Sequence, residues 1–391
     1  MSTYETPTVR IGLISLLVLG ALGCGEAGER TRPTQAHPTA EQRTTSELRP
    51  TDPSDSFGYE GAEATSHVSP GGEFKIWWVE QGEHAPPAGD DDGDGVPDYV
   101  ETVAQTADEV AAHLRDNDWK IALGDDIGSS GSPPGGDPRF DIYLVDFENG
   151  DGHYVKDACQ TNSAGVSQCA GHFRLENDFA GLAYESPEAG ARLVLSHEYF
   201  HAVQDAYMAD LPAWWREGTA TWFEEYVDPS QNDFERLTTL YFREHGRSLH
   251  DRSRGPADGY AYGAAIFVYF LELEIGADGV RSIFETIAEG PALLEALAGE
   301  LSAHETTLSD AFVQFATWNL FTGDRAMDQY TYPDAERFAE VDIETQQIDG
   351  ALARLDIDTY KAAINPTEEE IKAYWETIQD AFTTEPLRQF T

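Results

Sequence analysis

The Ser-His-Glu-Tyr-Phe-His segment at residues 196–201 constrains this chain more than any other. In a helix, His197 and His201 lie one turn apart on the same face, so both imidazoles can reach one metal ion while Glu198 lies beside them. Zinc in a catalytic site takes three protein ligands and a water whose pKa it lowers, and a neighbouring carboxylate can accept that water's proton. The segment predicts a zinc-dependent hydrolase, with an accidental match on a structural helix as the alternative.

The flanking residues favour a helix here. Ser186 can cap its amino end, Pro187 suits the first helical position, and no further proline occurs until Pro212. A second helix opening at Pro212 would pack back on the first and offer Glu217 as the third zinc ligand.

At Glu217 the sequence resembles the gluzincin peptidases, the group that includes thermolysin-like enzymes and the alanyl aminopeptidase family. The Glu-Gly-Thr-Ala stretch at 217–220 is similar to the Asn-Glu-Gly-Phe-Ala stretch that supplies the third zinc ligand in those aminopeptidases, and Glu224 matches their second acid. The resemblance implies zinc held by His197, His201 and Glu217, with Glu198 as the general base. The metzincin motif is not met, because Gln204 and Tyr207 occupy the places of its glycine and third histidine.

A second match lies downstream, in the Gly-Tyr-Ala-Tyr-Gly segment at 259–263. It is similar to the Tyr-x-Lys-Gly segment of the same aminopeptidases, whose tyrosine stabilises the tetrahedral oxyanion. By position the resemblance assigns that role to Tyr260 and puts Tyr262 in place of the lysine. The start of a buried aromatic helix is the alternative interpretation. The aminopeptidase motif that grips a free amine is matched only faintly, at 175–177, which favours an endopeptidase.

The resemblance covers roughly residues 172–271 and implies an α+β fold: a zincin-like catalytic domain whose mixed twisted sheet carries the active-site helix, followed by a mostly helical C-terminal lobe. Residue patterns predict strands at 74–79 and 140–145 and a hairpin through 153–155 and 172–175. They predict helices at 264–275, 279–289, 292–301, 308–320 and near the C-terminus from Thr367. We expect the upper lobe to span residues 57–226 and the lower lobe 227–391.

The acidic segment at 90–101 has the spacing of an EF-hand calcium loop, with glycine at its sixth position. The predicted ligands are Asp90, Asp92, Asp94, the carbonyl of Val96, Asp98 and Glu101. Two prolines, at 86 and 87, remove the preceding helix, so we expect one structural calcium ion; a solvated run of acids is the alternative. The chain as a whole is similar to a group of uncharacterised bacterial secreted proteins of metalloprotease type that combine these helices with such a loop.

The amino terminus predicts export. An apolar run at 11–22 ends at Gly23-Cys24, which resembles a bacterial lipoprotein processing site, so residues 1–23 form the signal peptide and Cys24 carries lipid. An ordinary secretory signal is the alternative. Residues 24–56 are polar and are expected to form a disordered tether. The remaining cysteines, Cys159 and Cys169, are expected to pair as a disulfide in an oxidising compartment.

The chain carries 71 acidic and 25 basic residues, a formal net charge of -46. This charge argues against nucleic acid as a partner and is typical of a saline or calcium-rich exterior. The sequence therefore predicts an extracytoplasmic, lipid-anchored zinc metallopeptidase acting on peptides or proteins. The alternatives are a calcium-binding surface lipoprotein that keeps the fold without turnover, and a hydrolase of a non-peptide amide.

Overall fold

The computed structural model describes residues 48–52, 58–127, 133–147, 150–230, 233–250, 258–327 and 332–341. The chain divides into two compact units, Met1–Val341 and Asp342–Thr391, and the description below concerns the first. The predicted signal peptide, Cys24, most of the tether and the C-terminal helix lie outside the described residues. Within the described ranges no helix combines the length and apolarity that a bilayer span requires.

Five strands form one mixed sheet in the order β1-β2-β3-β5-β4. The strands are β1 (Ala64–Val68), β2 (Phe74–Val79), β3 (Phe140–Val145), β4 (Gly152–Thr161) and β5 (Ser167–Glu176). β2, β3 and β5 run parallel to one another, while β1 and β4 are antiparallel edge strands. The predicted strands at 74–79 and 140–145 are confirmed, and the hairpin is longer than predicted. β1 was missed because none of its five residues is fully buried and they lack a clear apolar alternation.

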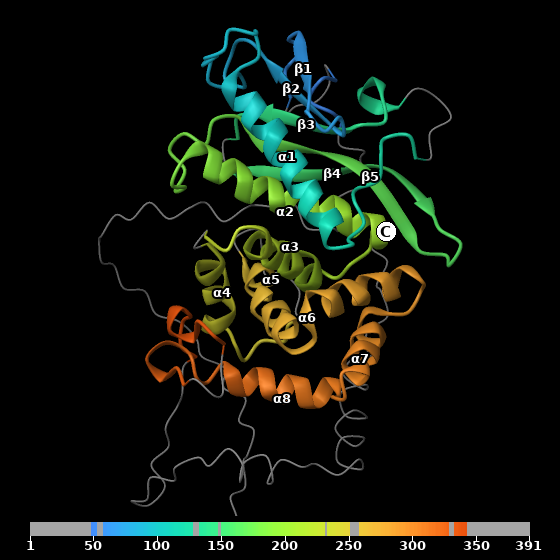
Figure 1. Cartoon of the computed structure of the whole chain (residues 1–391), viewed down its shortest axis with the longest axis vertical. Helices are drawn as coiled ribbons and strands as arrows, with labels where there is room; N and C mark the ends of the chain where they lie inside the picture. The colour runs from blue at the N-terminus through green and yellow to red at the C-terminus, as the bar shows by residue number, and fades with distance from the viewer. Residues whose placement is uncertain are drawn as a thin grey trace, which may run out of the picture. The chain divides into compact units, whose positions relative to one another are not determined.

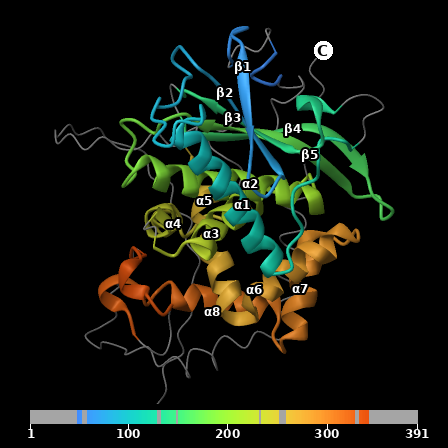
Figure 2. The same ribbon diagram turned by 45° about the horizontal axis from the view of Figure 1, so that its top comes forward.

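Helices α1 and α2 cover one face of this sheet, and α3 to α8 lie beyond α2 (Figures 1 and 2). The helices are α1 (Asp98–Asp116), α2 (Pro187–Tyr207), α3 (Ala213–Val227), α4 (Asp233–Arg243), α5 (Tyr260–Gly263), α6 (Ala265–Ala288), α7 (Leu293–Ala303) and α8 (Leu308–Trp318), with short 3-10 turns η2 (Pro134–Gly136), η3 (Gly323–Arg325) and η4 (Ala335–Arg337). Because α2 lies between two layers, every residue from Leu193 to Tyr207 is buried. The α+β prediction is confirmed.

Helix α6 joins two helices that the sequence analysis predicted separately, at 264–275 and 279–289. The interruption between them is a kink at Gly276, whose φ of 77° and ψ of 161° are open to glycine and strained for other residues. The two predicted helices are therefore confirmed on either side of Gly276, within the single element α6.

One apolar core connects the sheet to the lower helices. Trp119, which follows α1, contacts the rings of Phe200, Tyr207, Trp222 and Phe284 at centroid distances of 5.3, 6.3, 6.1 and 5.6 Å. These four rings come from α2, α3 and α6. Such aromatic pairs each add about 0.5–1.5 kcal/mol beyond the area they bury, so Trp119 holds three helices in register around α2.

The other face of the sheet carries a charged cluster. Arg49, in the segment predicted as tether, donates to Asp125, Asp141 and Asp157, with 2.8 Å between its Nη2 and Asp125 Oδ2. His172, a possible metal ligand by residue type, instead places Nδ1 3.0 Å from the Asp157 carboxylate. Residues 48–52 are therefore bound to the sheet through ion pairs of Arg49, which no local sequence pattern predicts.

The Arg49 cluster predicts a pH-dependent stability. Burial raises the pKa of Asp125 to about 8, with Arg49 opposing the rise and the neighbouring aspartates adding to it. Because the folded-state pKa lies above the unfolded value of 3.8, the stabilisation is complete below that value and is lost as the pH rises through about 8. Urea titrations at about pH 5 and about pH 9 should show this fall in the free energy of unfolding, and Asp125→Asn should reduce it.

The exposed neighbour Asp126 supplies the control. Asp126→Asn should keep the pH dependence of the unmodified chain. An equal fall in the free energy of unfolding between the two pH values for Asp125→Asn and the unmodified chain would show that the Asp125 carboxyl does not cause the pH dependence.

Candidate metal centre and active site

Helix α2 starts as the sequence predicts and carries the two histidines on one face. The Ser186 hydroxyl accepts from the backbone amide of Ala189 at 3.2 Å, and Pro187 is the first helical residue. The rings of His197 and His201 lie with centroids 4.7 Å apart, and both side chains are buried.

Helix α3 brings Glu217 to the same point. Its Oε2 lies 3.5 Å from His197 Nε2 and 3.3 Å from His201 Nε2, and the three donor atoms lie within 4.8 Å of one another. Ligands about 2.0–2.1 Å from a tetrahedral zinc would be about 3.3–3.4 Å apart. His197 Nε2 is also buried without a hydrogen-bond partner in the part of the chain that the structure describes. The three predicted ligands are brought together, and their spacing and chemistry fit zinc.

His197 is oriented by Glu224, which lies seven residues, or two helical turns, beyond Glu217 in α3. Its Nδ1 is 2.5 Å from Glu224 Oε1, and both side chains are buried. Burial alone would lower the pKa of His197, but the nearby carboxylates of Glu217 and Glu224 outweigh it and raise that pKa to about 10. Because the proton on Nδ1 faces a carboxylate, Nε2 is the nitrogen directed at the other ligands.

Glu198 faces the edge strand β4. Its Oε2 accepts from the backbone amide of Tyr154 at 2.8 Å. Two residues earlier, a Cβ on Gly152 would lie 2.4 Å from Val194 Cγ1 and 2.8 Å from Glu198 Cγ, so only glycine lets the strand approach the helix this closely. A backbone amide of β4 thus holds the carboxylate of Glu198, the residue that the sequence predicts as the general base.

The structure places Tyr262 against the metal cluster and gives Tyr260, to which the resemblance assigns the oxyanion, other contacts. The Tyr260 hydroxyl donates to the carbonyl of Arg247 at 2.8 Å, and its ring stacks on Tyr241. The Tyr262 ring instead lies against His197, with centroids 5.7 Å apart. Burial, followed by the charges of Glu217 and Glu198, raises the pKa of Tyr262 well above its ordinary value, so its hydroxyl keeps its proton.

The segment at 175–177 holds loops in place. Glu176 accepts from the backbone amide of Phe147 at 2.9 Å, and burial raises its pKa to about 8. The Asn177 side chain donates to the carbonyls of Glu83 and Ala85. These contacts account for the two polar residues that faintly match the amine-gripping motif.

The acidic loop before α1 folds around its own carboxylates. Oxygens of Asp90, Asp92 and Asp94 lie within 4.8 Å of one another, and all three residues are exposed. Asp90 accepts from the amides of Gly93 and Gly95 at 2.8 and 3.0 Å. Desolvation, with the charges of Asp92 and Asp94, raises the pKa of Glu101. The loop thus brings three of its six predicted ligands together and leads into α1.

The predicted disulfide between Cys159 and Cys169 is present and joins opposite residues of β4 and β5. It crosslinks the strand that contacts Glu198 to its neighbour in the sheet.

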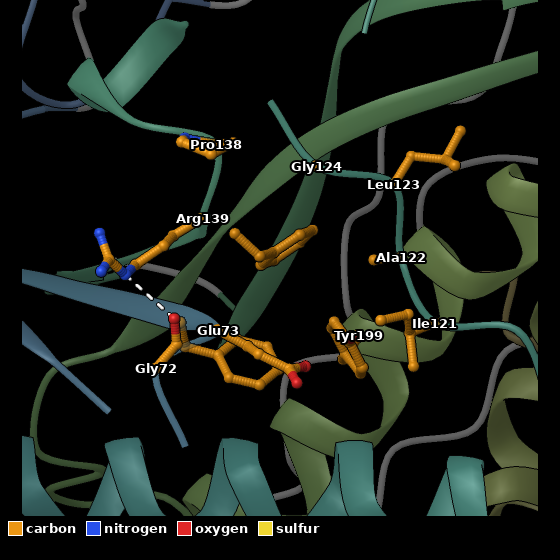
Figure 3. Close-up of a pocket in the computed structure, with 11 residues that line it drawn as sticks. Gly72, Glu73, Ile121, Ala122, Leu123, Gly124, Pro138, Arg139 and Tyr199 are labelled. Carbon is orange, nitrogen blue, oxygen red and sulfur yellow. Dashed lines mark hydrogen bonds between the residues drawn. The ribbon is translucent and has the colours of Figure 1, made fainter. Parts of the chain in front are cut away.

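A cavity of about 270 Å³ reaches Tyr199, the residue after Glu198. Figure 3 shows its rim, where Arg139 Nε donates to the Gly72 carbonyl. It is lined by Gly72, Glu73, Phe74, Ile121, Ala122, Leu123, Gly124, Pro138, Arg139, Phe140 and Tyr199. None of the predicted zinc ligands is among these residues, so the cavity belongs to the sheet side of α2.

No protein-family model matches the chain, and no curated protein matches its sequence. Among solved structures, an M1 zinc metallopeptidase from Deinococcus radiodurans matches with 15% identity and a TM-score of 0.34, covering 72% of this chain and 54% of that one. A mutant M1 enzyme from the same organism bound to a Tyr-Ser-Ala substrate matches with 16% identity and a TM-score of 0.35, covering 69% and 54%. A two-domain M1 mutant bound to L-tryptophan gives the same figures.

The chain spans about half the length of each of these structures. TM-scores of this size carry no argument about activity, so the functional assignment rests on the geometry of the site.

Proposed function

We propose that this chain is an extracytoplasmic, zinc-dependent metallopeptidase of the gluzincin type that hydrolyses peptide bonds as an endopeptidase. The observation that carries the proposal is the convergence of His197, His201 and Glu217 beside a carboxylate, Glu198, that the edge strand holds in place. Two imidazole nitrogens and one carboxylate oxygen are a donor set of catalytic zinc. The disulfide supports a location in an oxidising compartment, where the predicted lipid on Cys24 would tether the chain.

Each residue has a distinct chemical task in this proposal. Zinc held by the three ligands would supply a Lewis acid that polarises the scissile carbonyl and lowers the pKa of a water. Glu198 takes the proton of the attacking water and returns it to the leaving nitrogen. The protonated hydroxyl of Tyr262 donates to the negative charge that develops on the carbonyl oxygen.

The position of β4 supports an extended peptide as the substrate. β4 is the edge strand next to α2, and its amide at Tyr154 faces Glu198. An extended chain can add to such an edge through main-chain hydrogen bonds, with its scissile bond at the carboxylate. Binding through main chain does not require a free amino terminus, which supports an endopeptidase.

Removing the base should separate catalysis from metal binding. Glu198→Gln should lower kcat on the order of 10²–10⁴-fold because proton transfer is lost, while zinc content stays at one ion per chain. Glu217→Ala should lose both zinc and activity. Metal analysis and hydrolysis of an unmodified protein substrate by residues 48–391 measure the two effects.

Glu188→Gln, an exposed change in the first turn of α2, is the matched control and should alter neither property. A binding protein without turnover would bind zinc and show no hydrolysis in any variant. Absence of zinc from the unmodified chain would refute the proposal outright.

The two tyrosines give a second prediction. Tyr262→Phe should lower kcat on the order of 10²–10³-fold with little change in KM, because the lost donor acts on charge present only in the transition state. Tyr260→Phe should retain most of its kcat. Steady-state kinetics on both variants measures this difference, and equal losses in the two would return the assignment to Tyr260 or to neither.

We also propose that the 90–101 loop binds one structural calcium ion. The grouping of Asp90, Asp92 and Asp94 supports it. Calcium at a hundredfold excess over its dissociation constant should stabilise the fold by about 2.7 kcal/mol, seen as a rise in Tm. Asp92→Asn should reduce the rise, while Asp116→Asn, an exposed change at the end of α1, should not. An equal Tm with and without calcium would contradict this site.

A further inference from the structure

Gln204 is a fully buried amide one turn beyond His201, and the reaction outlined above does not use it. Its Oε1 lies 2.9 Å from His201 Nδ1. Its Nε2 donates to the carbonyl of Arg216 at 2.7 Å and to the Thr219 hydroxyl at 2.8 Å. The Gln204 side chain therefore contacts one predicted zinc ligand, His201. It also contacts two residues, Arg216 and Thr219, that lie before and after another predicted ligand, Glu217.

The donors and acceptors in this network admit one arrangement. A backbone carbonyl only accepts, so the atom of Gln204 that faces Arg216 must be its NH₂ group. The Thr219 hydroxyl donates to the Trp215 carbonyl at 2.6 Å and so accepts the second amide hydrogen. The amide oxygen must then face His201, and Nδ1 of that ring must carry a hydrogen.

This arrangement determines what His201 presents to a metal. A neutral imidazole with its hydrogen on Nδ1 has its lone pair on Nε2. Nε2 is the atom that lies 3.3 Å from Glu217. The amide thus selects the tautomer and the ring orientation that zinc binding requires, and it does so from within the protein core.

The same amide also ties the third ligand to the second. Arg216 and Thr219 lie in the turn of α3 that carries Glu217, and both are bonded to the side chain that orients His201. A shift of α3 along α2 would break these bonds. The spacing between His201 and Glu217 is therefore set by a contact that involves neither metal-binding atom.

The two histidines are supported differently. His197 faces the carboxylate of Glu224, whereas His201 faces a neutral amide. Glu224 stands in the stretch of α3 that resembles the aminopeptidases, whereas Gln204 occupies the position of the metzincin glycine. We infer that Gln204 is a positioning residue of the zinc site, which fixes the tautomer of His201 and its distance to Glu217. The inference rests on the proposed zinc site.

Gln204→Met keeps the length and apolar stem of the side chain and removes the amide. Zinc affinity of the apo protein, measured by competition with a chelator well below the Tm, should fall on the order of 10–100-fold. Thr219→Val removes one of the two acceptors and leaves the contact with His201, so it should weaken zinc binding less. Gln168→Leu is the matched control, because the Gln168 amide also donates to a backbone carbonyl of this region, that of Ala206 in α2.

The outcomes are distinct. Weaker zinc binding in Gln204→Met, with Gln168→Leu at the affinity of the unmodified chain, supports the inference. Gln204→Met at full affinity overturns it, even if its Tm falls, because a merely structural amide would change stability alone. If Gln204→Met does not fold, full affinity in Thr219→Val overturns it. An unmodified chain without zinc overturns both this inference and the proposed function.

Discussion

The contact on which the site depends is the hydrogen bond from the amide of Tyr154 to Glu198. A carboxylate inside a protein needs a donor, because leaving it unpaired in a region of low dielectric costs several kcal/mol. Here the donor is main chain, and it comes from the strand that forms the edge of the sheet. Gly152 makes the approach possible, since any side chain at that position would overlap α2. The close packing of β4 on α2 at Gly152 and the hydrogen bond from Tyr154 therefore fix the position of the Glu198 carboxylate relative to the sheet.

Polar groups within α2 are stabilised by the neighbouring elements in the same way. Asp205, one residue after Gln204, is fully buried and accepts from Arg216 at 2.6 Å, with Lys156 of β4 at 3.5 Å. Ion pairs of this kind contribute little net stability, because the two charges must first be desolvated. Their value here is geometric: Arg216 precedes Glu217, so the pair fixes the depth of α3 against α2.

The sequence could predict what local spacing determines and little else. Helical periodicity places His197 and His201 on one face, and apolar alternation gives strands such as Phe74–Val79. Sequence position alone did not predict that Tyr262 lies against His197, because α5 is a single turn in which residues two apart point to different sides, and only tertiary packing decides which tyrosine does so. Arg49 and its aspartates come from segments far apart in the chain, and no local signal predicts them. Gln204 had a usable signal in the sequence: an amide at i+3 from a predicted ligand, on a helix predicted to be buried.

The disulfide in the β4–β5 hairpin joins β4 to β5 five residues along β4 from Tyr154, the residue whose amide contacts Glu198. Successive residues of β4 face opposite sides, so a slip of one position would turn Gly152 outward and present a side chain to α2. Cys159 and Cys169 are opposite residues in the ladder, beyond a register shift at Lys156/Ala158. A covalent bond there forbids any slip that would leave the cysteines unpaired. The crosslink therefore fixes the register of β4 against β5 and, through it, which face of β4 packs on the active-site helix α2.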